Sequence, residues 1–307
     1  MREENIVLVS GGTGSAKLIL GFKSVIERFT VIANVADNFW FYGLYVCPDV
    51  DISCYTLSGI SDTSKGWGIA GDTFRMIEQI GKLGFENWFK LGDLDVATSI
   101  VRTYLLKNGL TLTEVTETIS KALGIKQTVI PATDDHYETH ILTPDGEMHL
   151  QEFWVKYSAK KEVLDVKYVG IENSEISKKA SKALLDADRI ILCPGNPITS
   201  IMPVLSLPKM RDILISSKAK KIAVSPIVGG RAFSGPACKF LRAKGLDCSS
   251  VSVARLYSKL IDAFVIHTDD FKLAKDIENA GVRCFVTDIE IADKQKAAEI
   301  AERLISI

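Results

Sequence analysis

A short apolar strand, a glycine-rich turn and a helix follow one another at the N-terminus. Residues Ile6–Ser10 (IVLVS) are apolar and β-branched, which is typical of a strand buried on both faces. Gly11–Lys17 (GGTGSAK) follows, and apolar residues then recur at helical spacing from Leu18 to Ile26. This order is typical of the first crossover of a doubly wound sheet. We therefore predict an α/β fold with a mostly parallel, Rossmann-like sheet.

The glycine-rich turn is a candidate anion site. Glycines let backbone amides approach an anion, and the N-terminus of the next helix adds positive partial charge. The dinucleotide fingerprint is broken because Lys17 occupies its third-glycine position, and no Walker A lysine follows. The alternative is a tight strand-to-helix turn that binds nothing. We predict phosphate binding by Gly11, Gly12, Thr13 and Gly14.

A second turn of this kind follows the predicted buried strand Arg189–Leu192. Its sequence, CPGNPITS, joins a glycine and an asparagine to two hydroxyl residues at the expected start of a helix. Such a turn can also cradle an anion. We predict that it contributes Gly195, Asn196, Thr199 and Ser200 to nucleotide binding.

The alternation of strands and helices is interrupted once. Glu138–Leu142 and Met148–Val155 flank a TPDGE segment, which predicts an antiparallel hairpin, and Lys156–Lys167 resembles a solvated loop. No repeat or obvious linker divides the chain. We expect one Rossmann-like domain over residues 1–307, with about 60–165 forming an inserted hairpin and helical region.

Carboxylates and aromatic side chains gather in residues 34–51, directly after an apolar run that predicts a strand. Asp37, Asp49 and Asp51 stand among five aromatic residues, of which Trp40 is the largest. Carboxylates beside stacking surfaces at the carboxyl end of a strand suit a metal-assisted site for a flat ligand. The alternative is an aromatic-rich loop that covers the core, with the aspartates in turns and helix caps.

Three expectations concern the segments that follow. Residues 51–57 form a strand or an extended run. Asp72 caps a helix that runs through Ile80. Lys90 and Asp93 lie at a junction between an apolar strand and a helix, where sheet proteins keep their chemistry. The alternative is that Lys90 is a solvated charge at the end of the strand and Asp93 a turn former.

The formal net charge of −1 gives no electrostatic reason to expect nucleic acid or an anionic membrane as partner. The six cysteines form no Cys-x-x-Cys pair, which favours reduced, mostly buried thiols. The segment of His136 and His140 is β-branched rather than helical, which argues against a metal site there. With no signal-peptide pattern and no apolar run of about 20 residues, we expect a cytoplasmic protein.

Short motifs recur in one order from Ser10 to about Asp262. They are Ser10–Gly14, Asn34–Trp40, Gly43–Asp51, Trp67–Gly68, Leu91–Thr98, Pro131–Asp135, Pro194–Ser200, Val224–Gly229 and Ser234–Ala237. Each motif alone is weak, but their order is specific. Together they resemble the 2-phospho-L-lactate transferase family of deazaflavin coenzyme F-420 biosynthesis.

This resemblance implies transfer of a phospholactyl group from a guanosine diphosphate-linked donor to the ribityl hydroxyl of the deazariboflavin Fo. Guanosine monophosphate (GMP) would leave, and Mg²⁺ would neutralise the diphosphate. The family pattern places Asp51 and Lys90 at the acceptor as catalytic and binding residues. By the same resemblance, Trp40 stacks on or covers the deazaflavin, Asp51 and Asp37 bind the metal, and both glycine-bearing turns hold the nucleotide phosphates.

The chain departs from the family pattern at Asn38, Leu94 and Ser99, where an acidic residue, an arginine and a histidine are usual. These changes leave the donor open, so phosphoenolpyruvate- or phosphoglycerate-derived donors remain alternatives. A non-catalytic, nucleotide-sugar-binding regulator of the related gluconeogenesis-factor-like family is a second reading, although its Gly-Gly-Ser-Ser run is absent here. An NAD-dependent dehydrogenase conflicts with the broken fingerprint. A homodimer is the expected assembly.

Overall fold

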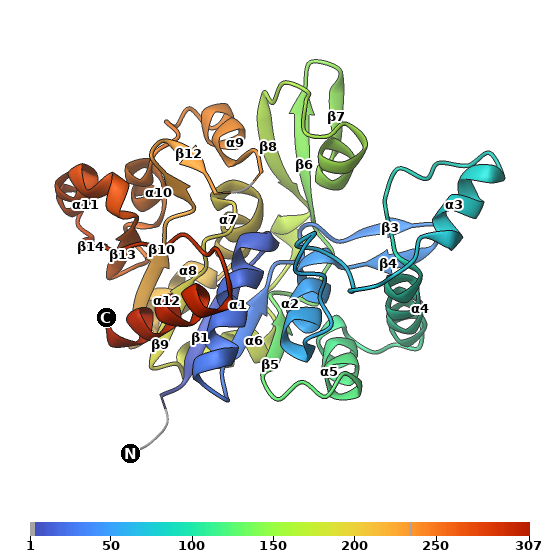
Figure 1. The fold of residues 1–307 in the computed structure, drawn as a ribbon, viewed down its shortest axis with the longest axis horizontal. Helices are drawn as coiled ribbons and strands as arrows, with labels where there is room; N and C mark the ends of the chain where they lie inside the picture. Colours follow the sequence, from blue (N-terminus) through green and yellow to red (C-terminus); the bar gives the residue numbers. More distant parts are fainter. Residues whose placement is uncertain (1–3, 234) are drawn as a thin grey trace.

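The computed structural model describes residues 4–233 and 235–307; Ser234, part of one family-like motif, lies outside the described residues. Its centre is a seven-stranded sheet of order β14-β13-β10-β9-β1-β2-β5 in which every pairing is parallel (Figure 1). The strands are β1 Ile6–Ser10, β2 Thr30–Ala33, β5 Thr128–Pro131, β9 Arg189–Leu192, β10 Lys220–Val224, β13 Ala263–Ile266 and β14 Arg283–Val286.

Helices cover both faces of this sheet (Figure 1). They are α1 Gly12–Val25, α2 Pro48–Ser58, α6 Lys178–Leu185, α7 Met202–Leu205, α8 Met210–Ser216, α9 Ala237–Ala243, α10 Ser250–Tyr257, α11 Ala274–Asn279 and α12 Lys294–Ser306. Helices α1 and α12 approach so closely at Gly21 that a Cβ there would overlap the Ala297 carbonyl. The predicted doubly wound α/β fold is confirmed.

An arm extends from the sheet at the side of β5 (Figure 1). It consists of the hairpin β3 (Phe39–Phe41) and β4 (Leu44–Val46) with α3 (Arg75–Lys82), and α4 (Asp93–Lys107) and α5 (Leu112–Ala122) connect it to the sheet. The arm has a small apolar core of its own, formed by Phe39, Phe41, Val46, Ile77 and Leu91.

The predicted antiparallel insertion is confirmed as a three-stranded sheet of order β7-β6-β8. Strands β6 (Glu138–Thr143) and β7 (Gly146–His149) form the expected hairpin. The second strand is shorter than predicted, since a π-helical turn occupies Glu152–Lys156. The supposed loop also contains a strand, β8 (Asp165–Val169), which pairs along its whole length with β6. The division into domains stays a prediction.

The expectation of a strand at residues 51–57 is wrong, because α2 covers this segment. Pro48 begins the helix, and Asp49 and Asp51 in its first turn complement the helix dipole. Nearly every α2 side chain is buried, so the segment shows no polar face. Small polar residues are mixed with apolar ones in residues 51–57 without a helical period, so the pattern does not distinguish a buried helix from a strand.

The expected strand before α4 is also absent, since residues 88–92 form no strand. Their apolar side chains instead pack on the core of the arm. The expectation that Asp72 caps the helix through Ile80, which is α3, is wrong. Asp72 accepts hydrogen bonds from the Leu94 and Asp95 amides of α4, and Asp93 accepts one from the Met76 amide of α3.

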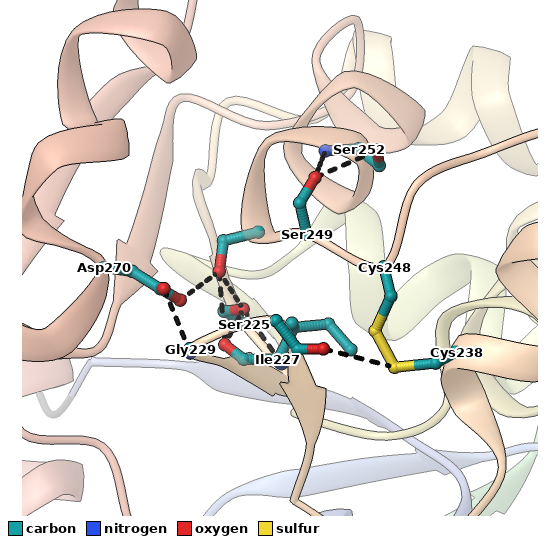
Figure 2. Close-up of a disulfide and its surroundings, with 10 residues drawn as sticks. Ser225, Ile227, Gly229, Cys238, Cys248, Ser249, Ser252 and Asp270 are labelled. Carbon is teal, nitrogen blue, oxygen red and sulfur yellow. Dashed lines mark hydrogen bonds between the residues drawn. A yellow bond between two sulfur atoms is a disulfide. The ribbon is translucent and has the colours of Figure 1, made fainter.

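The expectation of six reduced thiols is wrong for Cys238 and Cys248, which form a disulfide (Figure 2). It joins α9 to the segment before α10, beside the hairpin β11 (Ile227–Val228) and β12 (Arg231–Ala232). Cys47, Cys54 and Cys193 are buried free thiols. The folded chain brings these two cysteines together, and no local sequence pattern predicts the disulfide. No helix among residues 4–233 and 235–307 is long and apolar enough to cross a membrane.

Candidate active site

The order in which the chain adds strands to the parallel sheet reverses between β1 and β9. From β1 the sheet continues through β2 to β5, and from β9 it continues the other way through β10 and β13 to β14. A crevice opens at the carboxyl ends of the strands at such a reversal. The turns after β1 and β9 touch there, because a Cβ at Gly14 would overlap the Pro194 carbonyl and one at Gly195 would overlap the Gly11 carbonyl.

A cavity of about 410 Å³ lies beside these turns. Its walls include most of the predicted nucleotide-binding residues and the predicted catalytic Lys90. Of the residues predicted for the site, it contacts Gly12, Thr13, Gly14, Asp37, Lys90, Gly195, Asn196, Thr199 and Ser200, whereas Gly11, Trp40 and Asp51 are not among its lining residues.

Two carboxylates meet at one wall of the cavity. The side-chain amide of Asn34 donates to Asp37 Oδ1 (3.1 Å) and to Asp49 Oδ2 (2.9 Å). The Gly12 amide donates to Asp49 Oδ1 (2.7 Å). Burial, and then the charge of Asp49, raise the pKa of Asp37 well above its usual value, and burial raises the pKa of Asp49. Among the residues that the structure describes, no Lys, Arg or His forms an ion pair with either of these buried acids.

This pair fits the way in which Mg²⁺ is bound. Magnesium usually takes one or two protein carboxylates and completes its shell with water and substrate phosphate oxygens. Among the residues that the structure describes, no group of three or more His, Cys, Asp and Glu could hold a metal. The chain thus offers two carboxylates beside a phosphate-sized cradle rather than a closed protein cage.

The cradle itself has a free hydrogen-bond donor. Asn196 Oδ1 accepts from the Ile198 and Thr199 amides and caps the turn that follows. Its Nδ2 is buried and has no partner among the described residues. The amide group of a cavity-lining asparagine is thereby oriented to donate to a ligand oxygen.

Asp51 lies behind this wall and is engaged by Arg102 of α4. The two side chains form a buried ion pair in which Arg102 is 1% exposed, and Arg102 also donates to the Tyr45 carbonyl. Burial raises the pKa of Asp51 and the guanidinium opposes that rise. The catalytic and metal-binding roles of Asp51 stay predictions, because the structure joins it to Arg102 rather than to the cavity.

The aromatic wall of the cavity comes from three separate segments. Trp67 precedes α3, Phe89 lies in the arm, and Trp154 belongs to the π-helical turn after β7. Trp40 is 51% exposed and packs instead against Tyr45, with the two rings tilted by 42°. Sequence reasoning missed Phe89 and Trp154, although Phe89 is adjacent to the predicted Lys90, which was a usable signal. It also gave Asp49 only a supporting role, although its helix-start position was a usable signal.

The sequence model of the family described as "2-phospho-L-lactate transferase CofD" matches residues 6–305. Proteins named 2-phospho-L-lactate transferase from Methanosarcina acetivorans and Methanocaldococcus jannaschii are 39% and 42% identical, over 98% and 89% of each chain. A Streptomyces griseus protein named phosphoenolpyruvate transferase is 35% identical over 98% of each chain.

The chain belongs to the CofD family. It is therefore a transferase enzyme. A UPF0052-family protein from Bacillus halodurans has a similar structure, with a TM-score of 0.67, 18% identity and 99% of each chain covered. That likeness shows the shared fold alone. Of the residues that depart from the family pattern, Leu94 is exposed on α4 and Ser99 is buried, and neither contacts the cavity.

The buried ion pair predicts the effect of Asp51→Asn on stability. The Arg102 guanidinium stays charged at every accessible pH, so loss of its counter-charge should lower the free energy of unfolding by about 3–5 kcal/mol. Urea denaturation measures this. The double variant Asp51→Asn/Arg102→Met should recover most of the loss. A single variant with wild-type stability and no turnover would instead assign Asp51 a chemical role.

Proposed function

We propose that this enzyme transfers a phospholactyl group from a guanosine diphosphate-linked donor to the terminal ribityl hydroxyl of the deazariboflavin Fo. The hydroxyl oxygen forms a bond to the phosphorus that carries lactate, the bond from that phosphorus to the bridging oxygen breaks, and GMP leaves. The observation that carries this proposal is one cavity that joins an anion cradle, paired carboxylates and an aromatic wall.

Each part of the cavity has a role in this reaction. Trp67, Phe89 and Trp154 offer flat apolar surfaces to the deazaflavin ring. Lys90 lines the same cavity, and its ammonium can stabilise negative charge that develops on the transferred phosphoryl group. The catalytic work is positioning and electrostatic stabilisation, as is usual in phosphoryl transfer.

Asp37 and Asp49 would hold Mg²⁺, which supplies charge neutralisation at the diphosphate when bound. Asn34 keeps both carboxylates in place by donating one hydrogen bond to each. The Asn196 side-chain amide would donate to a phosphate oxygen of the donor. We propose that Asp51 acts indirectly. Its ion pair with Arg102 fixes the start of α2 and thereby the position of Asp49.

The test of the reaction is turnover with defined donors. Purified enzyme with Fo, Mg²⁺ and the guanosine diphosphate-linked phospholactate should give the coupled deazaflavin and GMP, detected by mass. Lys90→Met should lower kcat/KM by roughly 10²–10³-fold, while Lys82→Met on the exposed end of α3 should leave it unchanged. Faster turnover with the phosphoenolpyruvate-linked donor would reassign the acid, and no turnover with any donor would refute the proposal.

Metal binding should depend on pH and on Asp49. The pKa of Asp37 is raised in the folded protein, so its contribution to stability is present at low pH and is lost as pH rises through the raised value. Mg²⁺ binds the deprotonated pair, so it should raise Tm more at about pH 8 than at about pH 5.5. Differential scanning fluorimetry measures both.

Asp49→Asn should abolish the Mg²⁺-dependent rise in Tm and the turnover. Without metal it should unfold at or above the wild-type temperature, because it removes a like-charge contact with Asp37. Asp247→Asn, an exposed aspartate outside the cavity, is the matched control and should keep the metal response. An Asp49→Asn variant that still gains Tm from Mg²⁺ would place the metal elsewhere.

We also propose that the enzyme is a homodimer that associates through the outer face of α4. Ile100, Val101 and Tyr104 are each about half exposed or more on this helix, at 51%, 47% and 65%. The first turn of α4 is acidic and its last turn carries Lys107. A two-fold axis that pairs α4 with its copy in antiparallel orientation would place opposite charges together at both ends.

Val101→Glu should convert the dimer to a monomer in size-exclusion chromatography with light scattering, because it buries a charge in an apolar contact. Ile215→Glu is the matched control, since Ile215 is 64% exposed on α8. A dimer that survives Val101→Glu, or a wild-type enzyme that is monomeric at micromolar concentration, would contradict this assignment.

A further inference from the structure

The aromatic wall of the main cavity is divided between two segments that no strand pairing connects. Phe89 and Lys90 lie in residues 83–92, which join α3 to α4 and form no helix or strand. Trp154 lies in the π-helical turn after β7. The hairpin β3–β4 and the sheet β7-β6-β8 are separate, so no ladder of backbone hydrogen bonds joins the arm to the inserted sheet. Side-chain contacts must set the distance between these two parts of the wall.

One ion pair joins the two segments directly. Lys156 Nζ lies 2.9 Å from Glu86 Oε1. Glu86 belongs to the same segment as Phe89, and Lys156 belongs to the same π-helical turn as Trp154. Neither member of the pair lines the cavity. The pair therefore connects the two parts of the wall from outside the ligand site.

Neighbouring groups orient both members of the pair. Trp88 Nε1 donates to Glu86 Oε2 (3.2 Å), and the Tyr42 hydroxyl donates to the Glu86 carbonyl (2.8 Å). Glu152 Oε1 lies 3.1 Å from Lys156 Nζ, so the ammonium stands between two carboxylates. An isolated exposed ion pair contributes little, whereas charges in a network with fixed partners can hold a defined geometry.

The inserted sheet has its own anchors, so the pair acts mainly on the arm. A Cβ at Gly235 would overlap the Trp154 ring. Lys239 Nζ of α9 donates to the Ala159 carbonyl (2.6 Å), just after the π-helical turn. Lys90, by contrast, has no ion-pair partner in the part of the chain that the structure describes. Its position therefore depends on how its segment is held.

Two other contacts join the arm to the inserted sheet, and both come from the β3–β4 hairpin. The Tyr45 hydroxyl lies 3.2 Å from His136 Nδ1. The rings of Phe39 and His149 pack with their centroids 5.4 Å apart. The Glu86–Lys156 pair instead acts on residues 83–92 themselves.

We propose that Glu86 and Lys156 are positioning residues for the acceptor. Their pair holds Phe89 and Lys90 at the distance from Trp154 that fits a flat ring. This inference rests on the proposed function for the identity of the acceptor. Because the pair forms before the ligand arrives, ordering of residues 83–92 does not reduce the affinity. The pair therefore acts on acceptor binding and leaves the reacting groups to the cavity.

Isothermal titration calorimetry with Fo, in the absence of donor, tests this separately from turnover. Lys156→Glu places a third acidic group beside Glu86 and Glu152 and should raise the Kd for Fo by roughly three- to tenfold. Glu86→Lys should have a similar effect. The double exchange Glu86→Lys/Lys156→Glu should restore the wild-type Kd, because it restores opposite charges. In turnover, the single variants should raise KM for Fo by the same factor and leave kcat little changed.

The matched control is the ion pair of Lys126 with Glu27, at 2.8 Å. It also joins distant segments, but these precede β5 and β2 and lie at the opposite edge of the sheet from the cavity. Lys126→Glu should leave Fo binding unchanged. Single variants of the Glu86–Lys156 pair that bind Fo as tightly as the wild type would overturn the inference. A double exchange as weak as the single variants would also do so, because the pairing of charges would then not matter.

Hydrogen exchange of the ligand-free enzyme separates this inference from the proposed function. The amides of Leu91 and Asp93 are hydrogen-bonded and report on the segment. They should exchange faster in the single variants than in the wild type, and the double exchange should restore their protection. Equal protection in all variants would contradict the inference. A wild-type enzyme that shows this pattern but does not bind Fo would refute the proposed acceptor and leave the effect of the pair on the wall intact.

Discussion

Backbone contact between the turns after β1 and β9 determines the geometry of the site. A side chain at Gly14 would overlap the Pro194 carbonyl, and one at Gly195 would overlap the Gly11 carbonyl. Only glycine allows the two turns to approach this closely. Because each turn begins where a strand of the parallel sheet ends, this contact transmits the strand register to the cavity. The cradle is therefore as rigid as the sheet that carries it.

The paired carboxylates lower the stability of the metal-free protein, unlike the contact between the two turns. Asp37 and Asp49 are buried side by side, and one asparagine amide and the Gly12 amide are their principal donors. Burying two like charges costs free energy in the metal-free protein, as the raised pKa of Asp37 indicates. Such a cost is usual at a site prepared for a cation. By contrast, Asp51 has a full counter-charge in Arg102, which is the arrangement of a structural ion pair.

Much of the fold followed from the sequence because local pattern and tertiary structure agree in the parallel sheet. The strands that begin at Ile6 and Arg189, and the turns after them, have unambiguous apolar runs and glycines. The prediction failed at α2, where burial on all sides removes the helical period. It also missed the disulfide and strand β8, since both depend on pairing with distant segments.

The residues that line the candidate site also divide into those that the sequence predicted and those that it did not. Residues in turns after strands, such as Thr13, Asn196 and Asp37, could be found because position along a strand predicts position in the fold. Trp154 reaches the cavity from the inserted sheet, and no spacing rule connects it to the rest. Trp40 does not line the cavity, because proximity in sequence to a carboxylate does not decide the face of a hairpin on which a side chain lies, and its role at the deazaflavin stays a prediction.

Separate segments carry the different parts of the cavity, and this has a consequence for specificity. The anion cradle belongs to the sheet, whereas the aromatic wall includes Trp154 of the inserted sheet and Phe89 of the arm. Loops and insertions tolerate substitution better than the strands of a sheet, so these walls can change while the strand order is kept. Relatives at 39% and 35% identity are named for two different three-carbon acids while matching nearly the whole chain. Near-complete coverage in both cases means that the fold does not select the acid, so local contacts must do so.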